Sequence, residues 1–426
     1  MGEKRICFAV LIHDNRELVK QLIDNIRHYC PNSLIVVYNG GKDRELLKDL
    51  DVLVCPTSRK LEYGYTTIYF IEIMEWLEEI KVEYDFLINI DSDALFIRKG
   101  YEEFIEKEMR DTDYMAVDYQ VASQDYFCGI EIQKDRKRWE PFFTFNPLYG
   151  AFNVGQVMNR RFTKTLIKST NIQLLKKALI ETPAFGTDEI IFANLVKEFG
   201  LRAKCYPSLM QTKQSSIGYD MHNLLIRYRP YITICELISR LNEDVDRYLC
   251  HPIHRTSHDP ARQLIMQLQK NNLKDDLNRD GVPITSKDIK HYKTSVPITS
   301  RYGNLEIVAI KENKLTHFYN ENGRWLETTK ITDDVTGTPL LFESGYGNFE
   351  VIAKSKKRGV THWWRENNRW QNKWYGPTII TKENITPITV TQLEDNRLIV
   401  VGTFEKKLCY FLRDDGNSWS WTGPYF

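Results

Sequence analysis

The sequence lacks the marks of several protein classes. Its eight cysteines include no CxxC pair and no regular framework, so we expect reduced, mostly buried thiols and no disulfide scaffold. No apolar run approaches the roughly 20 residues that span a bilayer. The apolar segment "RICFAVLI" is strand-length and is followed at once by His13 and Asp14, unlike a signal peptide. We therefore expect a cytoplasmic protein with no transmembrane segment.

An excess of charge of either sign is also missing. Lys and Arg total 58 against 57 for Asp and Glu, so no global field attracts nucleic acid or an anionic membrane surface. The 426 residues, of which 42% are hydrophobic, are enough for two or three domains with sizeable cores. Any specificity must come from a local site.

The first part of the chain alternates short apolar strands with helical patterns, which predicts a layered α/β domain. We expect strands over residues 6–12, 34–38, 52–55 and 86–90, with helices over 17–28 and 66–79 between them. This order is that of a mononucleotide-type, Rossmann-like half. We assign residues 1–267 to this domain.

Beyond it, the polar segment "KNNLKDDLNRDG" and two copies of "VPIT" predict a linker over residues 268–295. From residue 296 to 426 the chain repeats itself: "YGNLEIVAI", "YGNFEVIAK" and "DNRLIVVGT" align, and Trp325, Trp370 and Trp419 recur at similar spacing. A period in this range predicts three units like the four-stranded blades of a propeller. Their aromatic residues suit carbohydrate binding, although burial between blades is the alternative for most of them.

Two carboxylates end the apolar strand of residues 86–90. In an open α/β sheet ligands bind outside the carboxyl ends of the strands, which is where Asp91 and Asp93 are expected. Carboxylates at positions i and i+2 of extended chain point the same way and suit a divalent cation bridging to a diphosphate. The alternative is that Asp-Ser-Asp only forms a turn.

Three further segments accompany this pair: the opening strand that ends in His13 and Asp14, "YGAFNVGQVMNRRF" (residues 149–162), and "TPAFGTDEIIFANL" (residues 182–195). Together they resemble the A-type-fold nucleotide-sugar glycosyltransferases, and their order is similar to the core-2/I-branching acetylglucosaminyltransferases. Those enzymes generally do without a metal-binding Asp-x-Asp, whereas this chain has one. The departure favours a metal-dependent enzyme and leaves the sugar donor open.

The resemblance implies roles for individual residues. Asp93 would ligate Mn²⁺ or Mg²⁺ on the donor diphosphate, and Asp91 would contact the ribose or a metal-bound water. Glu189, beside Asp188, would act as general base towards an acceptor hydroxyl, with inversion at the anomeric carbon. The alternative for Asp188 and Glu189 is a favourable acidic helix start.

Other residues complete the expected site. A late histidine often completes the metal shell in such enzymes, which makes His251 or His254 a candidate; a histidine-rich surface loop is the rival explanation. No cysteine pair near them supplies a zinc site. For the nucleotide, which the resemblance suggests is uridine, the candidates are His13, Asp14, Asn39, Gly40, Tyr63 and Tyr65.

The resulting hypothesis is a metal-dependent glycosyltransferase, a hexosyl- or N-acetylhexosaminyltransferase, that moves a sugar from a nucleoside diphosphate to a glycan, glycolipid or protein. An aspartyl phosphohydrolase is disfavoured, because Ala94, Leu95 and Phe96 follow Asp93 where a Ser or Thr is needed. A non-catalytic carbohydrate-binding protein with a decayed transferase domain is the second alternative. The three repeats also predict either packing on the catalytic domain or homo-oligomers that complete a ring, of which we favour the latter.

Overall fold

The computed structural model describes residues 5–144, 146–169, 171–207, 214–215, 218–219, 225–243, 247–276, 292–321, 324–367, 373–416 and 418–426. The chain folds into two compact units, Met1–Ile232 with Val245–Asp259, and Thr233–Asp244 with Pro260–Phe426. Trp370 and most of the expected linker, residues 277–291, lie outside the described residues.

The two units do not follow the boundary predicted at residue 267. Helices α9 (Ile234–Asn242) and α10 (Pro260–Asp276) belong to the C-terminal unit. The side chain of Asn242 at the end of α9 exchanges two hydrogen bonds of 2.8 Å with the main chain of Leu408.

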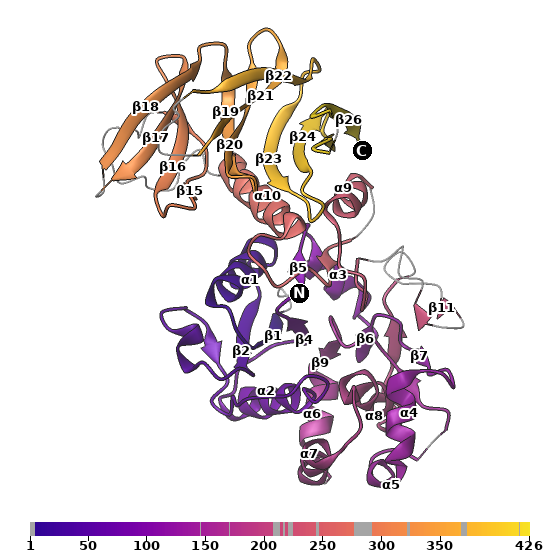
Figure 1. Ribbon diagram of the computed structural model, residues 1–426. Coiled ribbons are helices and arrows are strands. Elements are labelled where there is room, and N and C mark those ends of the chain that lie inside the picture. Colours follow the sequence, from indigo (N-terminus) through magenta and orange to yellow (C-terminus); the bar gives the residue numbers. More distant parts are fainter. Residues whose placement is uncertain are drawn as a thin grey trace. The chain divides into compact units, whose positions relative to one another are not determined.

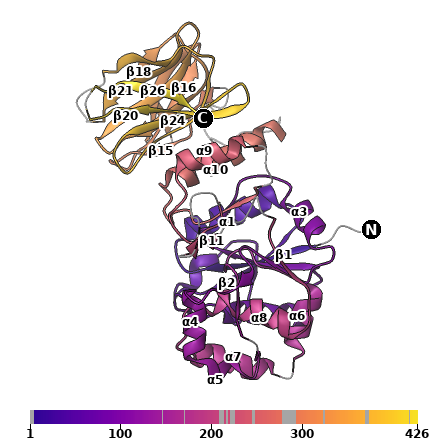
Figure 2. The same cartoon turned by 90° about the vertical axis from the view of Figure 1, so that its right-hand side faces the viewer.

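A mixed sheet forms the centre of the N-terminal unit (Figures 1 and 2). The described residues give a seven-stranded sheet in the order β10-β6-β9-β4-β1-β2-β3, in which only β9 runs antiparallel to its neighbours. The strands are β1 (Ile6–Ile12), β2 (Leu34–Asn39), β3 (Leu53–Val54), β4 (Phe86–Asp91), β6 (Tyr114–Ala116), β9 (Val157–Asn159) and β10 (Ala203–Cys205). The predicted strands of this region are confirmed, and so is the α/β class.

Helices cover both faces of this sheet (Figure 1). On one side of β1, Phe8 packs against Phe96, near α1 (Arg16–Tyr29). On the other, Cys7, Ala9 and Leu11 join a core with α2 (Ile68–Glu79) and α8 (Ile191–Glu198). Alternate residues of a strand point to opposite faces, and both faces of β1 are buried, so the strand reads as a continuous apolar run.

Shorter elements complete the N-terminal unit. Its other helices are α3 (Tyr101–Glu108), α4 (Phe127–Lys134), α5 (Arg136–Trp139), α6 (Arg160–Ile167) and α7 (Ile172–Glu181), with 3₁₀ turns at Arg44–Leu47 and Thr187–Glu189. Three small antiparallel pairs join β5 (Leu95–Phe96) to β13 (Leu249–Cys250), β7 (Gln120–Val121) to β8 (Tyr149–Gly150), and β11 (Gln214–Ser215) to β12 (Gly218–Tyr219).

The C-terminal unit contains three antiparallel sheets, one for each sequence repeat. The first holds β14 (Lys293–Thr294), β15 (Ile298–Thr299), β16 (Leu305–Lys311), β17 (Lys314–Glu321) and β18 (Arg324–Thr332). The second holds β19 (Thr336–Glu343), β20 (Asn348–Ser355), β21 (Gly359–Glu366) and β22 (Tyr375–Thr381). The third holds β23 (Thr386–Gln392), β24 (Leu398–Phe404), β25 (Lys407–Arg413) and β26 (Trp421–Tyr425). The all-β class of this region is confirmed, and the described residues form no closed ring.

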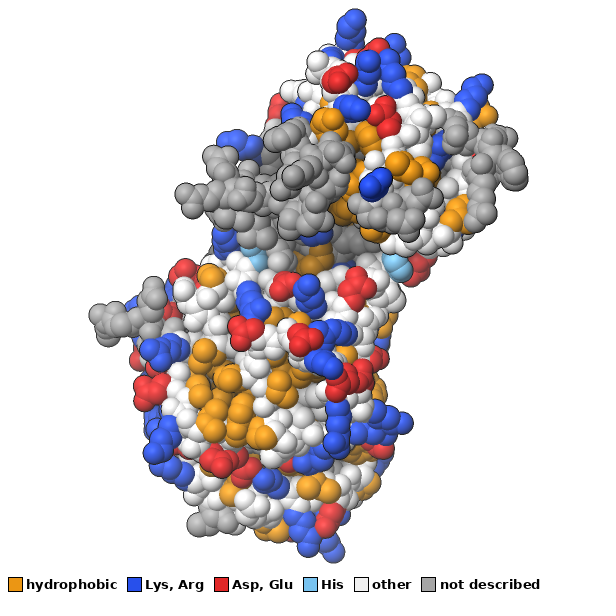
Figure 3. Space-filling model, turned by 90° about the vertical axis from the view of Figure 1, so that its left-hand side faces the viewer, with side chains coloured by type: hydrophobic (Ala, Val, Ile, Leu, Met, Phe, Trp, Pro, Cys, Tyr) orange, Lys and Arg blue, Asp and Glu red, His pale blue; other side chains and the backbone are white. Residues whose placement is uncertain are grey.

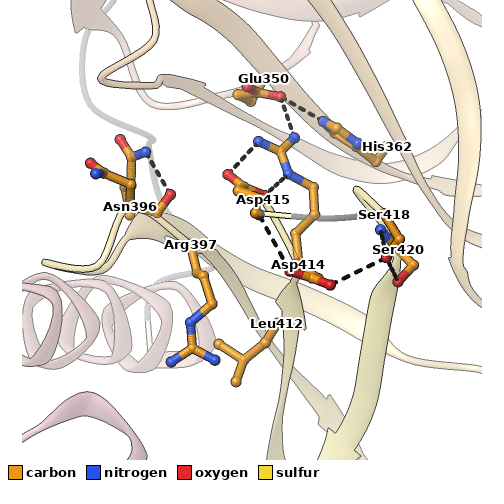
Figure 4. Close-up of polar contacts among 12 residues, drawn as sticks. Glu350, His362, Asn396, Arg397, Leu412, Asp414, Asp415, Ser418 and Ser420 are labelled. Atoms are coloured by element: carbon orange, nitrogen blue, oxygen red, sulfur yellow. Dashed lines mark hydrogen bonds and ion pairs between the residues drawn. The ribbon is translucent and has the colours of Figure 1, made fainter.

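A buried polar cluster joins the second sheet to the third (Figure 4). Glu350 of β20 and His362 of β21 point towards each other, with 2.7 Å between Oε2 and Nε2. Arg413 of β25 donates to the same Glu350 oxygen at 3.2 Å and also pairs with Asp415. All three side chains of the Glu350–His362–Arg413 set are almost fully buried, so their mutual pairing is what makes their burial tolerable.

The first and second sheets meet through an equivalent set. Glu306 and His317 approach to 3.1 Å, and Arg365 of the second sheet reaches His317 at 3.4 Å. A glutamate and a histidine from one repeat therefore face an arginine from the next. We call each of these sets a sheet junction.

The surface carries charges of both signs. On the face in Figure 3, Lys and Arg side chains lie among Asp and Glu side chains, and an apolar area lies on the N-terminal unit. None of the described helices is both long enough and apolar enough to cross a membrane. The eight cysteines, all within the described residues, form no disulfide.

Candidate active site

The carboxyl ends of β1 and β4 lie side by side where the sheet changes direction. Strands β2 and β3 follow β1 on one side, whereas β4 pairs with β1 on the other, with Leu11 opposite Asp91. Such a switch point is where open α/β sheets bind ligands. His13 and Asp14 leave β1 there, and Asp91 and Asp93 leave β4.

A later segment of the chain runs beside these aspartates. Strand β13 pairs with β5, and Ile253 donates a main-chain hydrogen bond of 2.9 Å to the Asp93 carbonyl oxygen. This pairing brings the His251 Nε2 atom to 3.2 Å from Asp93 Oδ1. It also brings the Arg255 guanidinium to 3.3 Å from Asp91 and 3.2 Å from Asp93.

The two carboxylates have opposite pKa shifts. Burial and the neighbouring Asp93 charge raise the pKa of Asp91. Burial alone would raise that of Asp93 too, but the His251 imidazole and the Arg255 guanidinium hold the Asp93 pKa well below its usual range. Burial opposes a charge on His251, yet the Asp93 carboxylate raises the pKa of the imidazole overall. Asp93 is therefore held ionised, whereas Asp91 is more easily protonated.

Asp93 and His251 have the chemistry of metal ligands. The Nδ1 atom of His251 lies 2.8 Å from the Arg227 carbonyl oxygen, which can only accept, so Nδ1 carries the proton. In a neutral ring Nε2 then directs its lone pair at the Asp93 carboxylate, which is favourable only with a proton or a cation between them. Mg²⁺ and Mn²⁺ commonly use one or two protein ligands together with phosphate oxygens.

Other parts of the expected metal shell are arranged differently. His254 stacks on Tyr231, with ring centroids 3.5 Å apart. Within the described part of the chain, no group of three or more His, Cys, Asp or Glu side chains is arranged to hold a metal ion. The Asp93–His251 pair fits a divalent cation shared with a diphosphate, and Arg255 is the positive charge that lies nearest both aspartates.

Glu189 and Asp188 lie in the 3₁₀ turn that precedes α8. The Asp188 carboxylate accepts from Thr66 and Asn153, both at 3.3 Å. The Oε2 atom of Glu189 accepts from the Tyr126 hydroxyl and, at 3.3 Å, from the Cys128 thiol. Burial, with a further contribution from Asp188, raises the Glu189 pKa to about 7 against the opposing effect of these two hydrogen bonds.

A small cavity is lined by one member of each acidic pair, Asp91 and Asp188. Thr66, Asn153 and Gln156 also line it. Gln156 donates to the Asp188 carbonyl oxygen at 2.8 Å, and its main chain donates to the Asn89 side chain at 2.7 Å. The buried Asn89 of β4 thereby holds the loop that separates the two carboxylate pairs.

The residues expected at the nucleotide divide into two groups. His13 packs over the loop after β2, where a Cβ on Gly41 would lie 1.8 Å from the His13 carbonyl oxygen. The Asn39 side chain is engaged in that loop, accepting from Gly41 at 2.9 Å and donating to the Asp43 carbonyl oxygen at 2.7 Å. Asp14 lies near enough to Arg255 to raise the pKa of the guanidinium, although Asp91 and Asp93 have larger effects and burial opposes them.

Tyr65 lies on the Glu189 side of the site rather than with His13. Its hydroxyl donates to the Pro183 carbonyl oxygen at 3.0 Å, and its ring centroid lies 6.2 Å from that of Phe185. The sequence did not single out Arg255, Tyr126 and Cys128, which contact candidate residues directly. Arg255 was present in the histidine-rich segment and could have been found as the cation nearest His254.

No protein-family model matches the chain, and no curated protein matches it. Among solved structures, the chain is similar to the BP39L lectin from Burkholderia pseudomallei, with 15% identity and a TM-score of 0.27. The similarity covers 32% of this chain and 40% of the lectin chain. At that TM-score it supports no conclusion about fold or function.

Proposed function

We propose that the chain is a metal-dependent glycosyltransferase of A-type fold, with three propeller-blade-like repeats at its C-terminus. The observation that carries the proposal is the pairing of an ionised Asp93 with His251 at a switch point. Asp91, two residues before Asp93, lines a cavity together with Asp188, the residue before Glu189. A nucleoside diphosphate needs positive charge at its phosphates, and a sugar hydroxyl needs a base. Both requirements are met by residues of this one site.

The roles follow from the charges. Asp93 and His251 would hold Mn²⁺ or Mg²⁺, which would supply positive charge to the donor diphosphate. Arg255 pairs with the same phosphates. Glu189 accepts the proton of the acceptor hydroxyl, whose oxygen bonds to the anomeric carbon as the bond to the nucleoside diphosphate breaks. Direct displacement of this kind inverts the anomeric configuration, and a UDP-sugar is the donor we favour.

The test is hydrolysis of a panel of nucleotide sugars with Mn²⁺, followed as release of the nucleoside diphosphate. We expect EDTA to abolish turnover, and Asp93→Asn to lose it with the fold intact, because the diphosphate then lacks its counter-charge. Asp51→Asn is the matched control, since the Asp51 side chain is fully exposed. Full activity in EDTA would overturn the metal dependence.

One observation favours a second candidate, a carbohydrate-binding protein whose transferase site is inactive. Arg255 already compensates Asp91 and Asp93, as a purely structural ion-pair network would. In that case the chain binds glycans but hydrolyses no nucleotide sugar, and Asp93→Asn lowers stability rather than activity. Thermal unfolding of Asp93→Asn beside the hydrolysis assay separates the two candidates.

A further inference from the structure

Four aromatic side chains gather beside Glu189. Tyr63, Phe127 and Tyr228 are 70%, 57% and 43% exposed. Exposed apolar side chains that are grouped mark an interaction site more than scattered ones do. Phe185 lies among them, with its ring centroid 5.5 Å from that of Tyr63 and 5.8 Å from that of Phe127. The Tyr63 and Tyr228 hydroxyls are hydrogen-bonded to each other. We call these four residues the aromatic rim.

Two glycines make this arrangement possible. Gly64 and Gly186 both have positive φ, and Gly186 donates a hydrogen bond of 2.9 Å to the Gly64 carbonyl oxygen. A Cβ on Gly64 would lie 2.0 Å from the Phe185 ring, and one on Gly186 would lie 2.4 Å from the Cys128 sulfur. No side chain fits at either position, so the loops that carry Tyr63 and Phe185 approach closely.

The rim adjoins the candidate base through the chain itself. Phe127 follows Tyr126, whose hydroxyl donates to Glu189 Oε2, and Phe185 precedes the turn that contains Glu189. Tyr228 lies near enough for the Glu189 charge to help raise its pKa, burial being the larger cause. Both donors to Glu189 reach Oε2, and no hydrogen bond to Oε1 is found among the described residues. Oε1 is thus the atom placed to accept a proton.

We infer that the aromatic rim is the acceptor site and that the acceptor is a glycan, an inference that rests on the proposed transferase function. A pyranose ring presents flat C–H faces and hydroxyls at its edges. Aromatic rings match the faces, while the tyrosine hydroxyls and the Glu189 carboxylate match the edges. An acyl chain offers no donor to the Oε1 atom of Glu189, and an extended peptide would need strand-edge partners for its main chain.

The experiment uses the full chain and removes two rings in Tyr63→Ala/Phe127→Ala. With oligosaccharide acceptors such as lactose, chitotriose and maltotriose, we expect the acceptor KM to rise about tenfold, which corresponds to about 1.4 kcal/mol of lost binding free energy. The rate of donor hydrolysis should change less. Tyr63→Phe/Phe127→Tyr keeps the rings and should restore most of the binding. Tyr346→Ala, which removes an exposed tyrosine from the C-terminal unit, is the control.

Each outcome bears on a different claim. If the wild-type protein hydrolyses no nucleotide sugar, the proposed function fails, and saturation-transfer NMR with the same oligosaccharides still tests the rim directly. If donor hydrolysis is present and the double variant transfers to glycans as well as the wild type, the inference is overturned. Rim dependence seen only with Ser/Thr peptides or long-chain alcohols would overturn it in favour of that acceptor class.

Discussion

The two oxygen atoms of the Glu189 carboxylate have different surroundings. Tyr126 and Cys128 donate to Oε2, which fixes the plane of the carboxylate and leaves Oε1 for an incoming hydroxyl. Burial raises the Glu189 pKa to about 7, and a base is most effective when its pKa lies near the working pH. The two hydrogen bonds therefore orient the Glu189 carboxylate and also limit the rise in its pKa that burial causes.

Replacing the base tests this assignment. Because Glu189 acts only when ionised, transfer should rise with pH up to the Glu189 pKa of about 7 and level off above it. Glu189→Gln should keep donor binding and lose about 10²–10⁴-fold of the transfer rate together with this pH limb. The pH profile of kcat/KM is the measurement. An inactive Asp188→Asn beside an active Glu189→Gln would move the role to Asp188.

Tyr126 is expected to act as a positioning residue. Its hydrogen bond stabilises the ionised form of Glu189, so Tyr126→Phe should raise the Glu189 pKa and move the limb upward by about one pH unit. Transfer at pH 6 should fall more than transfer at pH 9. Cys128→Ala, which removes a weaker donor, should give a smaller shift in the same direction. An unmoved limb would mean that Tyr126 only packs.

The acidic motifs of the site could be predicted from the sequence, whereas the residues that contact them in the folded chain could not. Asp93 and Glu189 stand out because each ends or starts an element beside a second acid. Arg255 and Tyr126 come from segments more than 60 residues away along the chain from the acids they contact. Nothing in the local sequence indicates that β13 pairs with β5, or that Tyr126 at the start of α4 contacts Glu189. Residue contacts of this kind depend on tertiary pairing, which periodicity does not encode.

Among the elements, the long strands and helices of the first half follow their apolar periodicity and were predicted well. The three repeats form separate antiparallel sheets, as their alignment indicated. The conserved spacing of the repeats did not indicate the sheet junctions, because each one combines a Glu–His pair of one repeat with an arginine roughly 50 residues later. These junctions explain why Glu350 and His362 are buried although they are polar.

A junction should be costly to break from one side. Arg413→Met leaves Glu350 buried without its arginine, and we expect a loss of about 3–5 kcal/mol in the free energy of unfolding. Urea unfolding followed by tryptophan fluorescence measures it. Arg358→Met is the control, because Arg358 pairs with Asp334 at 3.8 Å while half exposed, and such pairs contribute about 0–1 kcal/mol. Equal losses in the two variants would contradict a structural role for the junction.

At the scale of the whole molecule, the sequence predicts that two chains associate to complete a ring of blades. That prediction requires all three repeats to carry the same junction residues. Register places Asn320 of the first repeat where Arg365 and Arg413 stand in the others. It places Ile399 and Tyr410 of the third repeat where the others have glutamate and histidine. The outer repeats therefore lack the groups with which a second copy would form another junction.

We accordingly expect the intact chain to be a monomer in light scattering, and a dimer would contradict this view and support ring completion. Deletion of residues 290–426 should not give a well-behaved catalytic fragment, because α9 and α10 would lose strands β25 and β23, against which they pack. Binding of a hydrophobic dye to the fragment, compared with the intact chain, measures that exposure. A monodisperse fragment without dye binding would contradict the division into units.

The middle repeat is the only one of the three that carries both halves of a junction. Its Glu350 and His362 face the third sheet, while its Arg365 faces the first. Tandem copies of this repeat would each offer an acid–imidazole pair to the arginine of the next, so the array can grow by duplication of its centre. Duplicating either outer repeat would set Asn320 against a Glu–His pair or an arginine against Ile399 and Tyr410. Asn320, Ile399 and Tyr410 are thus the side chains that do not permit a further junction at either end of the array.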